Sequence, residues 1–356
     1  MRTSRRAQLG RHAITIHDVA ADSNVSIATV SRVLNEPWRV LPETKDRITA
    51  SISKLGYVPN IRARLLARGQ SGIICFLLSN RPFAHSVHAQ VLQGAAARAD
   101  IIGLQVIYAA CNYRPDTPPD EIALPSVLAT NGLIDGVVVA GTNYPNILTA
   151  LDELDLPYVM YGTNMVVPSD DFLPKAVYID GEHGGYLAAT YLLSLGHTQI
   201  RYVGDTTMPW YSRRYTGFCR AMEEAGLPCP PAVGSAAEGE MAMGFNTTNQ
   251  LLDSGEEFTA LFVGGDAGAL GALRALRRRG IAVPRDVSLV GFNDEDLANI
   301  AEPPLTTIRA ANEEAGMQCI EMLNGLVRHT IETAETVVVP VRLIERESAA
   351  APRMPS

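Results

Sequence analysis

The chain has 356 residues, of which 47% are hydrophobic and 19% charged, which excludes a largely disordered protein and predicts more than one globular domain. No apolar run reaches the roughly 18 residues of a membrane helix, and the N-terminus lacks the apolar stretch of a secretory signal, so we expect a cytoplasmic protein. Residues 1–70 hold 12 basic and 5 acidic residues (net +7) and the rest of the chain holds 18 and 33 (net −15), so a polyanionic partner is predicted for the head alone.

Three short helices are predicted to follow a disordered basic tail. Thr15 and Asp18 form the S/T-x-x-D/E pattern of a capping box, which starts the first helix. Asn24 tolerates the left-handed conformation that a tight turn between helices requires. The third helix is expected to have Pro42 in its first turn and to end at Gly56.

The second of these helices has an unusual composition. NVSIATVSRVLN, residues 24–35, is rich in β-branched residues and could be a strand by propensity. However, Ser26 stands at an N-cap position and no Gly or Pro interrupts the residues that follow. As a helix, the stretch turns Val30, Val33 and Leu34 inward, and the pattern becomes a helix-turn-helix.

A helix-turn-helix in a basic segment predicts DNA binding, although a small helical bundle or a protein-contact module are alternatives. Its hydroxyl groups can bond phosphates, its small apolar groups can touch thymine methyls, and Arg32 can bind a guanine edge. The candidate DNA-binding residues of the head are Thr15, Ser26, Ile27, Ala28, Thr29, Ser31, Arg32 and Asn35.

The segment after the head resembles a linker with conditional helicity. Pro59 disfavours helix at the residue before it, and Asn60 can cap a short helix that runs to about Arg68. A helix this short is marginal in isolation.

From residue 72 onward, short apolar strands alternate with helical stretches, which is typical of parallel sheets covered on both faces. The expected strands are GIICFLLS, LQVIYAA, IDGVVVAG, LPYVMYG, AVYID, IRYVGD, ALFVGGD and VSLVGFND. They fall into two sets, one before and one after about Gly162, which predicts two doubly wound lobes. The stretch ETVVVPVRLIERES is expected to be a last extended crossing.

Five cysteines are scattered along the chain and contain no CxxC pair. They are expected to be reduced and mostly buried, with neither a disulfide framework nor a zinc site. We therefore predict no metal and no cofactor. The cysteines are Cys75, Cys111, Cys219, Cys229 and Cys319.

TIHDVAADSNVSIATVSRVLN, followed by ETKDRITASISKLGYVPNIRARLLARGQSG, resembles the N-terminal signature of the lactose/galactose repressor family. LGHTQIRYVGD, SRRYTGFCRAMEEAGL, ALGALRALRRRGIAVPRDVSLVGFND and PPLTTIR resemble the effector domain of the same family, so the resemblance covers almost the whole chain. It implies a dimeric or tetrameric transcription regulator, usually a repressor, that binds a near-palindromic operator. It also implies a periplasmic-binding-protein-like pair of lobes that holds a small effector. The family usually has Gly in the turn, where this chain has Asn24.

The resemblance also implies roles for individual positions in the head and hinge. Ile27, Ala28 and Arg32 would read bases, and residues 60–67 would form a hinge helix. An apolar hinge side chain would pry open the minor groove, although a plain apolar helix face is the alternative. The hinge residues implied are Asn60, Ala63, Leu66 and Ala67.

The effector is expected at the carboxyl ends of the parallel strands. There the resemblance implies Arg214, Asp266 and Asn293 as ligand contacts, and Trp210 and Tyr211 are placed in sequence to supply an aromatic wall. Asp266 could instead only start a helix, and Trp210 could be a core or lobe-interface residue. The full candidate set is His85, His88, Tyr161, Trp210, Arg214, Asp266 and Asn293.

Carboxylates and an amide around the cleft suit a neutral polyol, so a sugar or sugar derivative is the expected effector. Arg214 could also pair a carboxylate, which keeps a sugar acid possible. Induction is favoured over corepression, and the protein is expected to act as a homodimer without contact with a membrane.

No HExxH, GxSxG, GxxxxGK[ST] or GxGxxG motif is present, which argues against an enzyme. The remaining alternative is a sugar-binding protein without a DNA role.

The predicted fold class is α/β, with a helix-turn-helix head, a hinge helix and two doubly wound lobes of periplasmic-binding-protein type. The predicted boundaries are residues 1–13 for the tail, 14–58 for the DNA-binding domain, 59–71 for the hinge, 72–347 for the effector-binding domain and 348–356 for a disordered tail. Lobe 1 is expected over about 72–162 and 309–339, and lobe 2 over about 163–308 and 340–347.

Overall fold

The computed structural model describes residues 14–35, 37–57, 70–81, 86–162, 165–166, 176–331 and 335–353. The chain divides into two compact units, with the division between Ser71 and Gly72. Within the described residues, no helix is long and apolar enough to cross a membrane. The predicted basic tail and almost all of the predicted hinge lie outside the described residues.

The first unit contains the predicted short helices, with a 3-10 turn between the second and third. They are α1 (Ile16–Asp22), α2 (Ile27–Asn35), η1 (Pro37–Arg39) and α3 (Pro42–Leu55). Two left-handed residues shape their connections, as expected: Asn24 has φ 49° in the turn before α2, and Gly56 has φ 65° after α3. The Asp18 carboxylate accepts from the Thr15 backbone N–H at 2.8 Å, which completes the capping box of α1.

A small shared core holds the three helices together. The predicted inward residues Val30 and Val33 are buried, with Leu34 packed against them. At the surface, the Asp22 carboxylate at the end of α1 accepts from Ser51 and Lys54 of α3. The buried members of the core are Val19, Ala20, Val30, Val33, Ile48 and Tyr57.

The second unit contains two sheets, as predicted. The first is parallel throughout, in the order β10-β5-β4-β3-β1-β2. Its strands are β1 (Ile73–Ser79), β2 (Gln105–Cys111), β3 (Gly136–Gly141), β4 (Tyr158–Tyr161), β5 (Ala176–Ile179) and β10 (Val337–Val339). Its helical segments are α5 (Ser86–Ile101), η2 (Pro119–Glu121), α6 (Ser126–Ala129), α7 (Pro145–Asp152) and α13 (Asn312–Val327).

The second sheet has the order β11-β9-β8-β7-β6, parallel except for the edge strand β11. Its strands are β6 (Ile200–Val203), β7 (Ala260–Val263), β8 (Ser288–Asn293), β9 (Thr306–Ala310) and β11 (Val341–Ile344). Its helices are α8 (Gly181–Ser194), α9 (Pro209–Glu224), α10 (Glu240–Asp253), α11 (Asp266–Arg278) and α12 (Asp296–Ile300).

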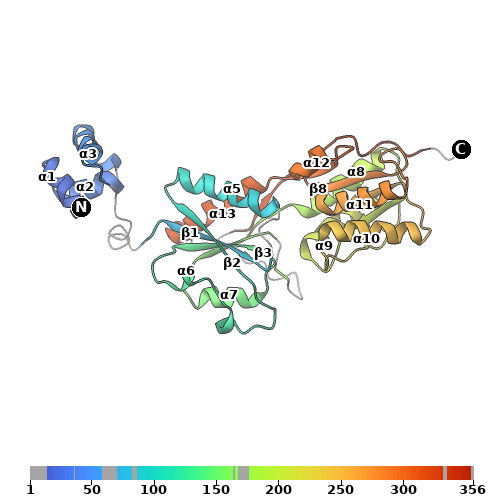
Figure 1. The fold of residues 1–356 in the computed structure, drawn as a ribbon, viewed down its shortest axis with the longest axis horizontal. Coiled ribbons are helices and arrows are strands. Elements are labelled where there is room, and N and C mark those ends of the chain that lie inside the picture. The colour runs from blue at the N-terminus through green and yellow to red at the C-terminus, as the bar shows by residue number, and fades with distance from the viewer. Residues whose placement is uncertain are drawn as a thin grey trace, which may run out of the picture. The chain divides into compact units, whose positions relative to one another are not determined.

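Each sheet has an apolar core on both faces, as the continuous apolar strands predict. In lobe 1, α5 and α13 lie side by side over one face and α7 covers the other (Figure 1). In lobe 2, α8 and α9 cover one face and α10 and α11 the other. Helices α8 and α9 approach so closely at Gly217 that a methyl group there would collide with the Glu182 carbonyl oxygen.

The predicted lobe boundary is wrong at two places. Strand β5 was assigned to lobe 2, but Ala176 pairs with Met160 of β4, so this strand belongs to the first sheet. Arg309 was assigned to lobe 1, but it pairs with Asn293 in the second sheet. A short, buried parallel strand looks the same in either sheet, so its sequence cannot tell which partner it joins.

The predicted disordered C-terminal tail is also wrong for residues 348–353. Ser348 is buried, and its carbonyl oxygen accepts from the Leu289 N–H at 2.7 Å. The Ala350 N–H donates to Ser288 Oγ at 3.0 Å. These two hydrogen bonds to β8 give order to a segment whose small residues show no periodic pattern.

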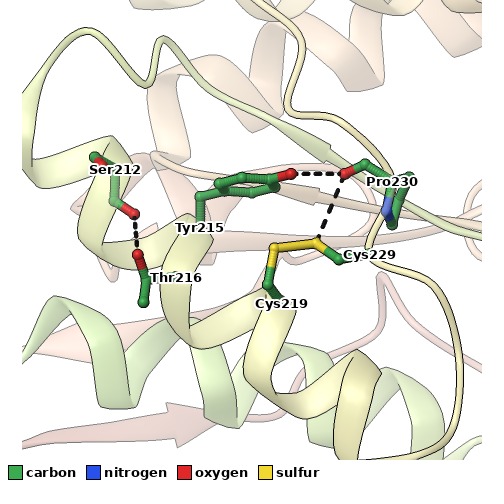
Figure 2. The surroundings of a disulfide bond; sticks show 6 residues. All are labelled: Ser212, Tyr215, Thr216, Cys219, Cys229 and Pro230. Carbon is green, nitrogen blue, oxygen red and sulfur yellow. Dashed lines mark hydrogen bonds between the residues drawn. A yellow bond between two sulfur atoms is a disulfide. The ribbon is translucent and has the colours of Figure 1, made fainter.

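The expectation that all five cysteines are reduced is wrong for two of them, because Cys219 and Cys229 form a disulfide with their Cα atoms 5.0 Å apart (Figure 2). The chain turns back after α9, and the Tyr215 hydroxyl donates to the Pro230 carbonyl at 3.0 Å beside the bond. Ten residues of separation conceal this proximity in the sequence. The other three cysteines are free and buried.

Candidate functional site

The first candidate site is the outer face of α2 in the head. Ser26 Oγ accepts from the Thr29 N–H at 3.1 Å, which confirms Ser26 as the cap that starts this helix. The same oxygen shares a 2.8 Å bond with Thr29 Oγ1. The cap therefore fixes the first turn of a helix whose composition would also suit a strand.

Burial divides α2 into two faces. Val30 is fully buried, whereas Ile27 is 41% exposed although it is large and apolar. Ala28 and Arg32 are exposed as well. The three residues predicted to read bases therefore share the solvent-facing side of one helix.

The other predicted DNA contacts of the head vary in accessibility. Thr15 and Ser26 are exposed, and Thr29 and Ser31 are half-buried. The Thr15 hydroxyl donates to the Asp18 carboxylate at 2.8 Å, so it is already engaged in the cap of α1. Asn35 ends α2, and its side chain lies outside the described residues, as do Asn60, Ala63, Leu66 and Ala67.

The second candidate site is a cleft in the second unit, with a free volume of about 80 Å³. Lobe 1 supplies Arg81, His88, Tyr161 and Asn312 to its lining. Lobe 2 supplies Trp210, Arg213, Arg214, Glu240 and Asn293. Five of the seven predicted effector contacts are thus brought together: His88, Tyr161, Trp210, Arg214 and Asn293.

The lobe 1 wall is a chain of fixed polar groups. The Tyr161 hydroxyl donates to Asn312 Oδ1 at 2.9 Å, and Asn312 Nδ2 donates to Gln90 Oε1 at 2.8 Å. The His88 ring meets Tyr161 edge-on, with centroids 6.5 Å apart. Burial raises the pKa of Tyr161, so its phenol stays neutral and can donate throughout the physiological pH range.

The centre of the lobe 2 wall is Arg214, which is only 9% exposed. Its guanidinium donates to the Gly264 carbonyl oxygen and, at 3.3 Å, to Asn293 Oδ1. It also lies 3.7 Å from the centroid of the Phe292 ring. Gly264 directly follows β7, and Phe292 and Asn293 belong to β8, so contacts from two neighbouring strand ends hold the side chain in one orientation.

Arg81 connects the two walls. Its Nε donates to Thr142 Oγ1 of lobe 1 at 3.1 Å. Its guanidinium reaches lobe 2, with one nitrogen 3.5 Å from Glu240 Oε1 and its centre 4.6 Å from the Trp210 ring centroid. An ion pair and a cation–π contact between the lobes stabilise this cleft in its present width.

The structure places Asp266 away from the cleft, which does not support its predicted role as an effector contact. Its side chain is fully buried, accepts from Thr307 Oγ1 at 2.6 Å and from the Glu295 N–H at 2.8 Å, and does not line the cleft. Burial is the main cause that raises its pKa to about 7. Asp266 therefore fastens the β8–α12 loop to the start of α11. The last candidate, His85, lies outside the described residues.

Four charged or amide residues of the cleft lining were not predicted from the sequence: Arg81, Arg213, Glu240 and Asn312. Glu240 and Asn312 each begin a helix, α10 and α13, and Arg81 follows closely after β1. Because helix starts and strand ends meet at the same edge of a parallel sheet, these positions carried a usable signal. Arg213 was not predicted as an effector contact, although it is adjacent to the predicted contact Arg214.

Comparison with known proteins matches both units. Residues 15–60 match the family model described as bacterial regulatory proteins, lacI family, and residues 189–349 match the periplasmic binding protein-like domain. The chain is 32% identical over 340 residues to the HTH-type transcriptional regulator DegA of Bacillus subtilis (strain 168), covering 94% of this chain and 97% of DegA.

Two solved structures are similar over nearly the full length. A lac repressor dimer bound to operator and the anti-inducer ONPF has a TM-score of 0.74 and 27% identity, covering 95% of this chain and 99% of that one. A complex of the transcriptional regulator CelR with cellobiose has a TM-score of 0.69 and 28% identity, covering 94% and 100%.

Proposed function

The chain belongs to the lacI family of bacterial regulatory proteins, and from this premise we propose that α2 reads an operator while a sugar-like effector in the cleft controls that binding. The protein is an effector-responsive, DNA-binding transcriptional regulator. We propose further that it represses by binding as a dimer, so that two heads meet the two halves of a near-palindromic site.

The observation that carries the DNA assignment is the outer face of α2. Ile27 and Ala28 are exposed apolar residues, which water does not favour but which can contact thymine methyl groups in a major groove. Arg32 supplies the two-pronged donor that fits a guanine edge. With only one such fork among these three positions, DNA shape is expected to contribute much of the specificity.

The cleft suits a ligand rich in hydroxyl groups. Asn293 and Asn312 offer amide groups, Glu240 offers a carboxylate, and Trp210 offers a ring face. The related CelR forms a complex with cellobiose. The free volume of about 80 Å³ is below the several hundred that small-molecule pockets usually have, so Arg81 must move or the lobes must part when a sugar enters. Such a change of lobe geometry is the proposed signal to the head.

A sugar-binding protein without a DNA role is not favoured, because residues 15–60 match the regulator family. The similar proteins described above are transcriptional regulators rather than enzymes, and we propose that this chain likewise catalyses no reaction. Because its proposed partner is operator DNA, we place its action in the cytoplasm.

The proposed function is tested by selecting DNA from a random pool with the full-length protein and measuring affinity for the selected site. Arg32→Ala should weaken specific binding by ~1–3 kcal/mol. Arg47→Ala is the matched control, because Arg47 is an exposed cation on α3. The control should weaken selected and random DNA alike. Failure to enrich any site, or equal effects of the two substitutions on selected DNA, would contradict the assignment.

A further inference from the structure

The cleft has a surplus of positive charge. Arg81, Arg213 and Arg214 line it, whereas Glu240 is the only acidic residue in its lining among the residues described. Glu240 is 3.5 Å from Arg81, so that pair is already matched. The other two guanidinium groups face the cleft without an acid of their own there.

Arg214 has the greater need of a counter-charge, because only 9% of its surface is exposed to solvent. Its described hydrogen-bond acceptors are a carbonyl and an amide oxygen, both neutral, and its Nε is buried without a partner. A guanidinium has five N–H donors, and two are accounted for here. A buried charge is costly unless an opposite charge and full hydrogen bonding compensate it.

The acids closest in sequence to Asn293 are committed elsewhere. Asp294 pairs with Arg309 and with Arg346, both at its carboxylate. The Glu295 carboxylate accepts from Asn293 Nδ2 at 3.4 Å. Neither carboxylate lines the cleft. Among the described residues, the hydrogen bonds of Arg214 go to neutral oxygens, and neither of these two carboxylates supplies it with a counter-charge.

Backbone geometry adds to the positive potential. Five long helices have a residue of their first turn in the cleft lining: α5 with His88, α8 with Gly181, α9 with Trp210, α10 with Glu240 and α13 with Asn312. The N-terminal end of a helix carries a partial positive charge and unsatisfied N–H groups, so it favours an anion. At α5 and α9, whose first turns contain no acidic residue, this effect acts in the same direction as the unmatched arginines.

We propose that the effector is an anion, a sugar-sized molecule whose carboxylate or phosphate group binds Arg214 and Arg213. The proposal rests on the proposed function, since it assumes that the effector occupies this cleft. Arg213 is half-buried, 5.1 Å from the Tyr178 ring centroid, and adjoins Arg214 on α9. Amide groups and Trp210 remain for the hydroxyl groups and the ring of the same ligand.

The test is calorimetric titration of the full-length protein with probes that share one sugar ring and differ at C6, which carries a hydroxymethyl group, a carboxylate or a phosphate ester. One set is D-glucose, D-glucuronate and D-glucose 6-phosphate, and the second is D-galactose, D-galacturonate and D-galactose 6-phosphate. At least one anion should bind about tenfold or more tightly than its neutral parent, as a charge-assisted hydrogen bond implies. A carboxylate and a phosphate source are distinguished by which arm responds.

Arg214→Gln should remove that preference, and Arg213→Gln should reduce it, which keeps the test decisive if the first variant folds poorly. Arg220→Gln is the control, because it removes the same charge from α9 where Arg220 pairs with Glu182 outside the cleft lining. The proposal is overturned if neutral sugars bind as tightly as their anions, if no anion of the panel binds, or if both cleft variants keep the preference.

Operator binding is followed in parallel by fluorescence anisotropy. If a neutral sugar releases operator DNA, the proposed function stands and only the anionic character of the effector is refuted. If the protein selects no operator at all, the proposed function itself fails.

Discussion

Replacing Asp266 by Asn tests whether this residue is a buried structural group and not an effector contact. Thr307 Oγ1 and the Glu295 N–H lie 2.6 and 2.8 Å from its two oxygens. An asparagine can satisfy both partners, because its oxygen can accept from the N–H and its amide can donate to the hydroxyl. The substitution therefore removes a titratable proton without leaving an unpaired polar group.

The size of the effect follows from the pKa of Asp266, which is raised to about 7 from 3.8, chiefly by burial. Between these two values the folded state holds a proton that the unfolded state has released, so stability falls as pH rises. The slope is about 1.4 kcal/mol per pH unit. From pH 5 to pH 8 the wild type should therefore lose on the order of 3 kcal/mol relative to the Asn variant.

Urea unfolding measured at several pH values provides the assay. The chain has two tryptophans, and Trp38 lies in the head, 76% exposed. A Trp38→Phe background leaves Trp210 as the reporter for the effector domain. Subtracting the unfolding free energy of Asp266→Asn from that of the wild type cancels the other titrating groups, which both proteins share.

The difference should fall with pH up to about pH 7 and then level off. Parallel curves from pH 5 to pH 8 would show that the buried carboxyl has an ordinary pKa, and a difference that rises with pH would reverse the argument. The variant should also retain effector affinity, because Asp266 does not line the cleft. A selective loss of effector binding in a fully stable variant would restore the role that the sequence suggested.

Three other outcomes are expected. Val30→Asp should abolish operator binding while effector binding persists. An unsatisfied polar group in a core costs ~1–3 kcal/mol, and a charge in the core of the head should cost more than that. Fluorescence anisotropy and calorimetry on one preparation measure operator and effector binding. Gly217→Ala should lower the free energy of unfolding by about 1–3 kcal/mol, since the methyl group overpacks the contact between α8 and α9, and an unchanged urea midpoint would contradict this. Chain purified without reductant and then unfolded should show three titratable thiols, whereas five would disprove the bond between Cys219 and Cys229.

The head could be predicted almost completely because its signals are local. The capping of α2 depends on Ser26 and Thr29, three residues apart. The inward face is set by Val30 and Val33 through helical periodicity alone, and the turn needs only a left-handed residue at Asn24. No distant contact is required to fix any of these features, so β-branched composition did not mislead the helix assignment.

The strands of the two lobes could also be predicted from the sequence, but the strands with which they pair could not. Apolar runs such as β5 are recognisable because both faces of a parallel sheet are buried. That same burial makes β5 equally suited to either sheet, and only its pairing of Ala176 with Met160 decides the matter. The disulfide and the order of residues 348–353 have the same cause, because each depends on segments brought together by the tertiary fold.

In the cleft, the position of a residue at a helix start predicts some of the lining residues correctly but is not sufficient for all of them. Residues in the first turn of the helices that follow parallel strands lie at one edge of the sheet, and Trp210 and Asn312 reach the cleft in this way. Glu240 also reaches it from the start of a helix, although α10 follows α9. Asp266 occupies an equivalent place at the start of α11, yet the Glu295 N–H and the Thr307 hydroxyl take up its oxygens. The topology of the sheet therefore predicts which residues lie near the cleft, and the packing of the neighbouring loop determines which of them can contact a ligand.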